Sequence, residues 1–119
     1  MPYKQQIGKL GEQLAEKHLI NKGFLIIGRN YRVRGGEIDL ICRQGRQYFF
    51  IEVKTRTSAT FGYPEEALTF FKKRRIKTAI LRYLAEQKRP VKWQADLIAI
   101  ELDKISKKAQ LRHYPAIEL

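Results

Sequence analysis

Three charged residues on two neighbouring segments have the types and spacing needed for metal-assisted hydrolysis. Asp39 lies in the segment Gly36-Glu37-Ile38-Asp39-Leu40-Ile41, and Glu52 and Lys54 lie in Ile51-Glu52-Val53-Lys54. Magnesium prefers carboxylate oxygens supplemented by several water molecules. Such a cation activates water and polarises a phosphodiester, and a lysine beside that water stabilises the charge that develops. These residues therefore predict a Mg²⁺ or Mn²⁺ site that hydrolyses phosphodiester bonds.

This chemistry needs a β-hairpin that brings the two segments together. Residues 37–42 and 47–54 are rich in strand-forming side chains, and the short stretch between them contains Gly45. If Gly45 and Arg46 occupy the turn, Asp39 lies opposite Glu52, with Cβ atoms about 4.5–5.5 Å apart. We also expect Ile38 to share the apolar face of its strand with Leu40 and Cys42.

Two carboxylates at this separation repel each other, by about 4 kcal/mol at 4 Å and an effective dielectric of 20. Lys54 can neutralise one of them, whereas a divalent cation would relieve both. The alternative is an ordinary cross-strand charge pair on a solvated face, with no metal. In the same register Glu37 lies opposite Lys54, and we expect it to form an ion pair or to support a metal ligand.

The chain is strongly basic, with 24 Lys and Arg against 12 Asp and Glu among 119 residues, a net charge of +12. The excess is densest over residues 72–92, where Glu86 is the only acid. A charge of one sign on one element favours a phosphate-binding surface. The side chains expected to contact nucleic acid are Arg29, Arg32, Arg34, Arg56, Lys72, Lys73, Arg74, Arg75 and Lys77.

Composition excludes several other classes of protein. The single cysteine, Cys42, excludes a disulfide framework within the chain and cysteine-rich zinc sites, and it favours a cytoplasmic location. No apolar run reaches the ~18 residues of a membrane span, and no signal peptide is recognised. The histidines, His18 and His113, are far apart in the sequence, so we expect ordinary surface or packing roles for them.

Hydrophobic periodicity and turn residues indicate how the remaining elements are arranged. They predict helices over 4–22 and 65–87, a loop over 57–63, and strands over 24–27, 92–102 and 109–114. With the hairpin, the order is α-β-β-β-α-β-β, a small α/β or α+β fold with a mixed sheet, in a single domain over 1–119.

The hairpin residues, together with 11–16, 29–32, 61–67 and 95–100, resemble the PD-(D/E)xK nuclease superfamily. The similarity is greatest to a bacterial family of predicted endonucleases related to Holliday-junction resolvases, and it covers nearly the whole chain in order. The resemblance implies a restriction-endonuclease-like sheet flanked by helices. It also implies DNA, including branched DNA, as the substrate in repair or recombination, and it leaves a homodimer open.

The resemblance also implies a role for each site residue. Asp39 and Glu52 correspond to the metal-binding acids, with the backbone carbonyl oxygen of Val53 as an extra ligand. Lys54 corresponds to the lysine that orients or activates water, and Glu12 to a helix-borne acid that assists the metal site. Two alternatives remain open: a nucleic-acid-binding module without catalysis on a nuclease scaffold, and a basic adaptor for an acidic protein.

Overall fold

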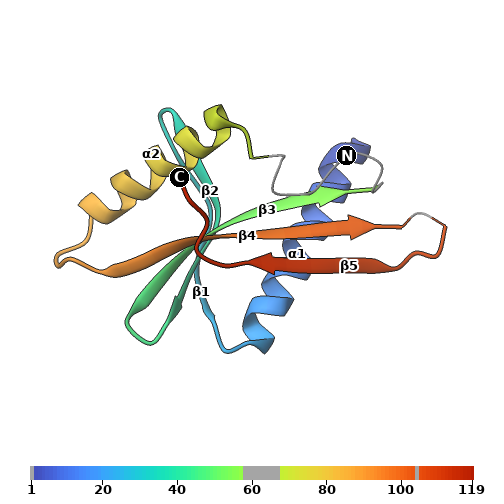
Figure 1. Ribbon diagram of the computed structural model, residues 1–119, viewed down its shortest axis with the longest axis horizontal. Helices are drawn as coiled ribbons and strands as arrows, with labels where there is room; N and C mark the ends of the chain where they lie inside the picture. Colours follow the sequence, from blue (N-terminus) through green and yellow to red (C-terminus); the bar gives the residue numbers. More distant parts are fainter. Residues whose placement is uncertain (1, 58–67, 104) are drawn as a thin grey trace.

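A computed structural model of the chain describes residues 2–57, 68–103 and 105–119. Its elements alternate in the predicted order, α-β-β-β-α-β-β, which confirms a mixed α+β fold (Figure 1). Their bounds are α1 (Tyr3–Asn21), β1 (Leu25–Val33), β2 (Gly36–Gln44), β3 (Gln47–Arg56), α2 (Phe70–Ala85), β4 (Lys92–Leu102) and β5 (Ala109–Tyr114).

The five strands form one mixed sheet in the order β1-β2-β3-β4-β5. β1 with β2, β2 with β3, and β4 with β5 pair antiparallel, whereas β3 and β4 pair parallel. A parallel pair needs a crossover connection, and the chain between β3 and β4 contains α2 for this purpose. The predicted hairpin register is confirmed, because Leu40 pairs with Ile51 and Gln44 with Gln47.

The two helices cover opposite faces of the sheet. Ala15 and Leu19 of α1 lie in one buried cluster, and Ile76, Ala79 and Ile80 of α2 lie in the other. Neighbouring residues along β3 and β4 alternate between these clusters, as the pleat of a strand requires. The α1 cluster takes Ile51, Val53, Ile98 and Ile100, and the α2 cluster takes Phe50, Ala95 and Leu97.

Two glycines allow the helices to approach the sheet closely. A Cβ atom on Gly36 of β2 would lie 2.5 Å from the carbonyl oxygen of Arg75 and 2.8 Å from the amide nitrogen of Ala79. A Cβ atom on Gly11 of α1 would lie 2.9 Å from Cβ of Thr55. Both contacts are shorter than carbon side chains tolerate. The backbone of α2 therefore packs on Gly36 of β2, and the backbone of α1 at Gly11 packs on the Thr55 side chain of β3, both near the residues predicted to bind metal.

The predicted bounds differ most from the structure in the first strand and the second helix. The first strand extends to Val33 rather than Ile27, because β1 pairs with β2 as far as Val33 opposite Gly36. The second helix ends at Ala85 rather than at residue 87.

The predicted helix also included residues 68 and 69, which are not helical in the structure. The helix begins at Phe70, and the Thr69 side chain caps it by accepting a hydrogen bond from the backbone N–H of Lys72. Residues 58–63 of the predicted loop and 65–67 of the predicted helix lie outside the described residues.

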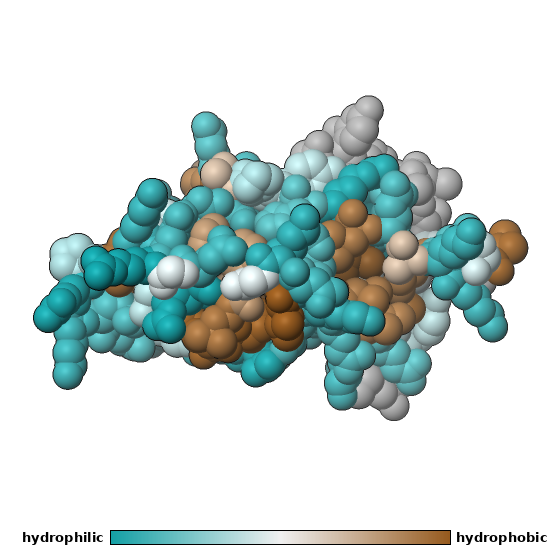
Figure 2. Space-filling model, turned by 90° about the horizontal axis from the view of Figure 1, so that it is seen from below, coloured by the Kyte–Doolittle hydropathy of each residue, from teal (hydrophilic) through white to brown (hydrophobic). Residues whose placement is uncertain are grey.

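The face of the molecule in Figure 2 is mainly hydrophilic, in keeping with the high content of lysine and arginine. Hydrophobic residues gather there in smaller patches. Within the part of the chain that the structure describes, neither helix has the length and apolar character needed to cross a membrane.

Candidate metal site

The candidate site lies where β2 and β3 cease to pair. The last backbone pair between them is Leu40 with Ile51, one residue short of Asp39 and Glu52. Beyond it, the backbone N–H of Val53 donates a 2.7 Å hydrogen bond to Oδ2 of Asp39. A side chain thus takes the place of a backbone partner, and this bond fixes the Asp39 carboxylate beside β3.

The expected alternation of β2 is wrong at this point. Ile38 packs in the α2 cluster, whereas Leu40 and Cys42 pack in the α1 cluster. The start of β2 lies directly under α2 at Gly36, so the side chain of Ile38 is buried against that helix. Asp39 lies between Ile38, which packs toward α2, and Leu40, which packs toward α1, and its side chain lines a cleft.

Asp39 and Glu52 form the acidic centre of the site. Their carboxyl groups are close enough to alter each other's pKa, and Glu52 is only 4% exposed. Burial and the neighbouring charge of Asp39 raise the pKa of Glu52 to about 7. The pKa of Asp39 is also raised, chiefly by burial, although the bond from Val53 opposes that shift. The paired carboxylates are therefore costly to charge unless a cation lies beside them.

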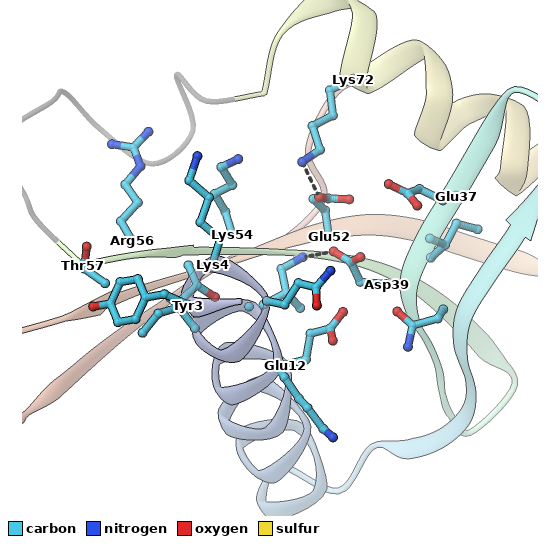
Figure 3. A pocket seen from close by; sticks show the side chains of 18 of the residues that line it. Tyr3, Lys4, Glu12, Glu37, Asp39, Glu52, Lys54, Arg56, Thr57 and Lys72 are labelled. Atoms are coloured by element: carbon cyan, nitrogen blue, oxygen red, sulfur yellow. Dashed lines mark hydrogen bonds and ion pairs between the residues drawn. The ribbon is translucent and has the colours of Figure 1, made fainter. Parts of the chain in front are cut away.

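Two lysines approach this acidic centre. Nζ of Lys72, from the first turn of α2, lies 3.1 Å from Oε1 of Glu52 (Figure 3). Lys54 is half-buried on β3, and its pKa is lowered by burial and then by the nearby ammonium of Lys72. The sequence predicted Lys72 as a phosphate contact, and the structure places it against a predicted metal ligand.

A cleft of about 1100 Å³ brings together all the predicted catalytic and metal-binding residues. Its lining includes Glu12, Asp39, Glu52, Val53 and Lys54. Glu12 reaches it from α1 and points toward Asp39, and its pKa is raised by burial and then by the Asp39 charge (Figure 3). The close contact between Gly11 and β3 explains how the next residue of α1 comes so near the sheet.

The donor set fits a hard divalent cation. Among the described residues, no group of three or more histidine, cysteine, aspartate or glutamate side chains could hold a metal. Structural zinc sites need four such ligands, whereas Mg²⁺ is commonly held by one or two carboxylates and keeps several waters. Asp39 and Glu52 supply two carboxylates, and the ammonium of Lys72 already occupies a cation position beside them.

The predicted nucleic-acid-binding side chains divide by location. Arg32, Arg56 and Lys72 line the cleft, and Arg75 lines a smaller pocket of about 190 Å³ beside Glu52. Those that line neither space are Arg29, Arg34, Lys73, Arg74 and Lys77.

Besides Lys72, two more of the predicted phosphate contacts pair with acids. Nε of Arg29 donates a 2.9 Å hydrogen bond to Glu16. Nε of Arg32 lies 3.6 Å from Oε2 of Glu37. Among the ion pairs of the described residues, Glu37 therefore has Arg32 as its partner rather than the expected Lys54.

A partly buried polar network at the other end of α1 was not predicted. Asp96, which is 1% exposed on β4, lies 2.8 Å from Nε2 of His113, and Nδ1 of His113 lies 3.2 Å from Nε2 of His18. Asp96 also accepts hydrogen bonds from Gln94 and from the backbone N–H of Ala116. An aspartate within an apolar strand was the only available signal, because the two histidines are 95 positions apart.

Fold and site together define a small α+β protein. Its cleft, beside the point where β2 and β3 cease to pair, contains the carboxylates of Asp39 and Glu52 and the lysines Lys54 and Lys72. The chain belongs to UPF0102, described as "Uncharacterised protein family UPF0102", which matches residues 11–100. The matched region contains the residues of the candidate site, from Glu12 to Lys72.

Individual relatives named "UPF0102 protein" match most of the chain. The protein from Nocardia farcinica is 44% identical over 115 residues, which cover 97% of this chain and 86% of the relative. The protein from Alkaliphilus oremlandii is 40% identical over 110 residues, covering 92% and 94%. A third, from Geobacter metallireducens, is 45% identical over 86 residues, covering 72% and 70%.

Proposed function

We propose that this protein is a metal-dependent DNA endonuclease of the resolvase-like type, which acts in the cytoplasm in repair or recombination. The observation that carries the proposal is the meeting of Asp39, Glu52 and Lys54 in one cleft. The resemblance to the PD-(D/E)xK superfamily supports it, because the residues that resemblance implies lie together in three dimensions.

Each residue of the cleft has a role in phosphodiester hydrolysis. Asp39 and Glu52 would hold Mg²⁺ or Mn²⁺ together with the carbonyl oxygen of Val53. The bound cation supplies a Lewis acid for the phosphate and lowers the pKa of a coordinated water. Lys54 orients the attacking water from β3, and burial lowers the pKa of its amine. Glu12 faces Asp39 from α1 and would accept a hydrogen bond from a water bound to the metal.

The charge distribution explains why a cation is needed before DNA can enter. The acids Glu12, Asp39 and Glu52 would repel the phosphate backbone in an otherwise basic protein. A divalent cation cancels this repulsion at the point where the scissile phosphate must lie. Arg32 and Arg56, which line the same cleft, then add positive charge to it.

A cleavage assay tests this function directly. Purified protein is incubated with branched, flapped, single-stranded and linear DNA in Mg²⁺ or Mn²⁺, and we expect at least one form to be cut. Asp39→Ala and Glu52→Ala should each abolish cleavage, whereas Glu118→Ala, which removes an exposed carboxylate, should not. Cleavage that survives both site variants would contradict the proposal.

A second candidate function is DNA binding without catalysis. It is favoured by the Lys72–Glu52 ion pair, because this pair balances one buried carboxylate without any metal. This candidate predicts salt-sensitive DNA binding that chelator does not alter, no heat of Mn²⁺ binding, and unchanged DNA affinity after Glu52→Ala. A calorimetric Mn²⁺ titration therefore separates the two functions.

A further inference from the structure

We propose that Lys72 is an internal counter-ion of the metal site. In the metal-free protein its ammonium neutralises Glu52, and a divalent cation displaces it toward a DNA phosphate. The inference rests on the proposed function only in taking Glu52 as a metal ligand. It adds a residue that competes with the metal before DNA binds and assists DNA binding afterwards.

The first step of the argument is that Lys72 and a metal need the same oxygen. Nζ of Lys72 lies 3.1 Å from Oε1 of Glu52, a carboxylate that is almost fully buried. Mg²⁺ binds carboxylate oxygen at 2.0–2.1 Å. A dication at that distance and an ammonium in its present place would lie close together with like charges. Binding of one therefore weakens binding of the other.

The second step is that the backbone of Lys72 is fixed while its side chain is not. Its N–H is held by the Thr69 cap at 3.1 Å, and α2 is pressed onto β2 at Gly36. The side chain itself is 32% exposed, unlike that of Glu52 at 5%. The displaced ammonium can therefore move by rotation of its own side chain, without any change in the helix.

The third step is that a second position is available to the ammonium. Lys72 lines both the main cleft and the smaller pocket, which Thr69, Phe71 and Arg75 also line. An ammonium displaced from Glu52 toward that pocket would approach Arg75. Two cations from one helix face, i and i+3, then bind a single phosphate beside the metal.

The test is a calorimetric Mn²⁺ titration of metal-free protein without DNA. Lys72→Met should tighten Mn²⁺ binding about tenfold, within the usual range of coupling between sites. Lys77→Met, which removes the same charge from an exposed position of α2, should change the affinity less than about twofold, because exposed charges at a distance are screened. Glu52→Gln should abolish binding.

A second measurement follows the lysine after it leaves Glu52. DNA affinity is measured against salt in a Lys54→Met background, chosen to suppress cleavage, with Mn²⁺ and with chelator. Lys72→Met should reduce the salt slope by about 0.9 in Mn²⁺, the value of one phosphate contact, and leave it unchanged in chelator. A structural role for Lys72 would change both slopes alike.

Several outcomes would overturn the inference. These are an unchanged or weaker Mn²⁺ affinity in Lys72→Met, or no Mn²⁺ binding by the wild type and the variant. If Lys72→Met does not fold, Lys72→Gln replaces it, and there too Mn²⁺ binding should tighten because the charge beside Glu52 is removed. Tighter Mn²⁺ binding without cleavage by any form would keep the counter-ion and reject the nuclease. Cleavage that needs Asp39, with unchanged Mn²⁺ affinity in Lys72→Met, would support the nuclease and reject the counter-ion role of Lys72.

Discussion

The carboxylate of Asp39 accepts the backbone N–H of Val53 immediately beyond the last backbone pair of β2 and β3. One side chain therefore has a structural task, satisfying a strand donor, in addition to its proposed metal-binding task. The two tasks respond differently to substitution, so they can be separated by experiment.

The first prediction compares two substitutions that remove the same charge. Asp39→Asn keeps an oxygen that can accept the Val53 N–H, whereas Asp39→Ala leaves this donor unpaired. An unsatisfied donor costs about 1–3 kcal/mol, so the asparagine variant should be more stable by about that amount. Urea unfolding in chelator measures this difference, and Mn²⁺ binding should be lost in both variants. Equal stability of the two would show that the bond contributes nothing.

The second prediction concerns stability against pH in the absence of metal. The pKa of Glu52 is about 7 in the folded protein and 4.5 as its ordinary value. Between these values the folded state keeps a proton that the unfolded chain has lost, so the free energy of unfolding falls as pH rises from 4.5 to 7.

Glu52→Gln stays neutral and should remove this loss. In chelator at pH 8 the variant should be more stable than the wild type by about 1–3 kcal/mol, and near pH 4 the two should be equal. Chemical unfolding at both pH values provides the measurement, with Glu118→Gln as the control for an exposed carboxylate. A variant that is less stable at pH 8 would mean that the Lys72 ion pair outweighs burial and repulsion.

The sequence predicted the core of the site because local signals determine it. A glycine-containing turn and strand-forming segments determine the hairpin register, and this register brings Asp39 and Glu52 to one residue beyond its last backbone pair. The length of β1 was missed for a local reason too. Arg29, Asn30 and Arg32 are polar residues on an edge strand, and they hide the apolar alternation that marks a strand.

The contacts that were not predicted join residues that are distant in sequence. Lys72 reaches Glu52 because α2 begins at Phe70 and is seated on Gly36, and neither fact is visible in the local pattern. The pairing of His18 with His113 requires the end of α1 to meet β5 across the sheet. Patterns in sequence report which face an element buries, but they do not report which side chains of two elements meet.

The third prediction uses two glycines of α1 that differ in their surroundings. A Cβ atom on Gly8 would have nothing within 4 Å, whereas one on Gly11 would overlap Thr55. Gly8→Ala should therefore stabilise the protein by up to about 1 kcal/mol, through helix propensity alone. Gly11→Ala should destabilise it by about 1–3 kcal/mol, because overpacking pushes α1 off β3.

The same pair of variants tests how Glu12 is positioned. If α1 moves away from β3, Glu12 moves away from Asp39, so Gly11→Ala should also weaken Mn²⁺ binding while Gly8→Ala should not. Thermal unfolding and Mn²⁺ calorimetry on both variants give the two readouts. Equal effects of the two alanines would contradict the close packing.

The last prediction concerns the network of His18, His113 and Asp96. The pKa of His18 is lowered by burial and then by His113 and Lys22, from an ordinary value of 6.5. Below pH 6.5 the unfolded chain therefore binds a proton that the folded state resists, and the free energy of unfolding should fall as pH drops through this window. His18→Gln, whose amide can still donate to Nδ1 of His113, does not titrate and should lose this dependence. Urea unfolding of both proteins at pH 5.5 and 7.5 provides the comparison. The prediction fails if the free energy of unfolding of the wild type falls no more than that of the variant between pH 7.5 and pH 5.5. The network would then hold α1 to β5 without sensing pH.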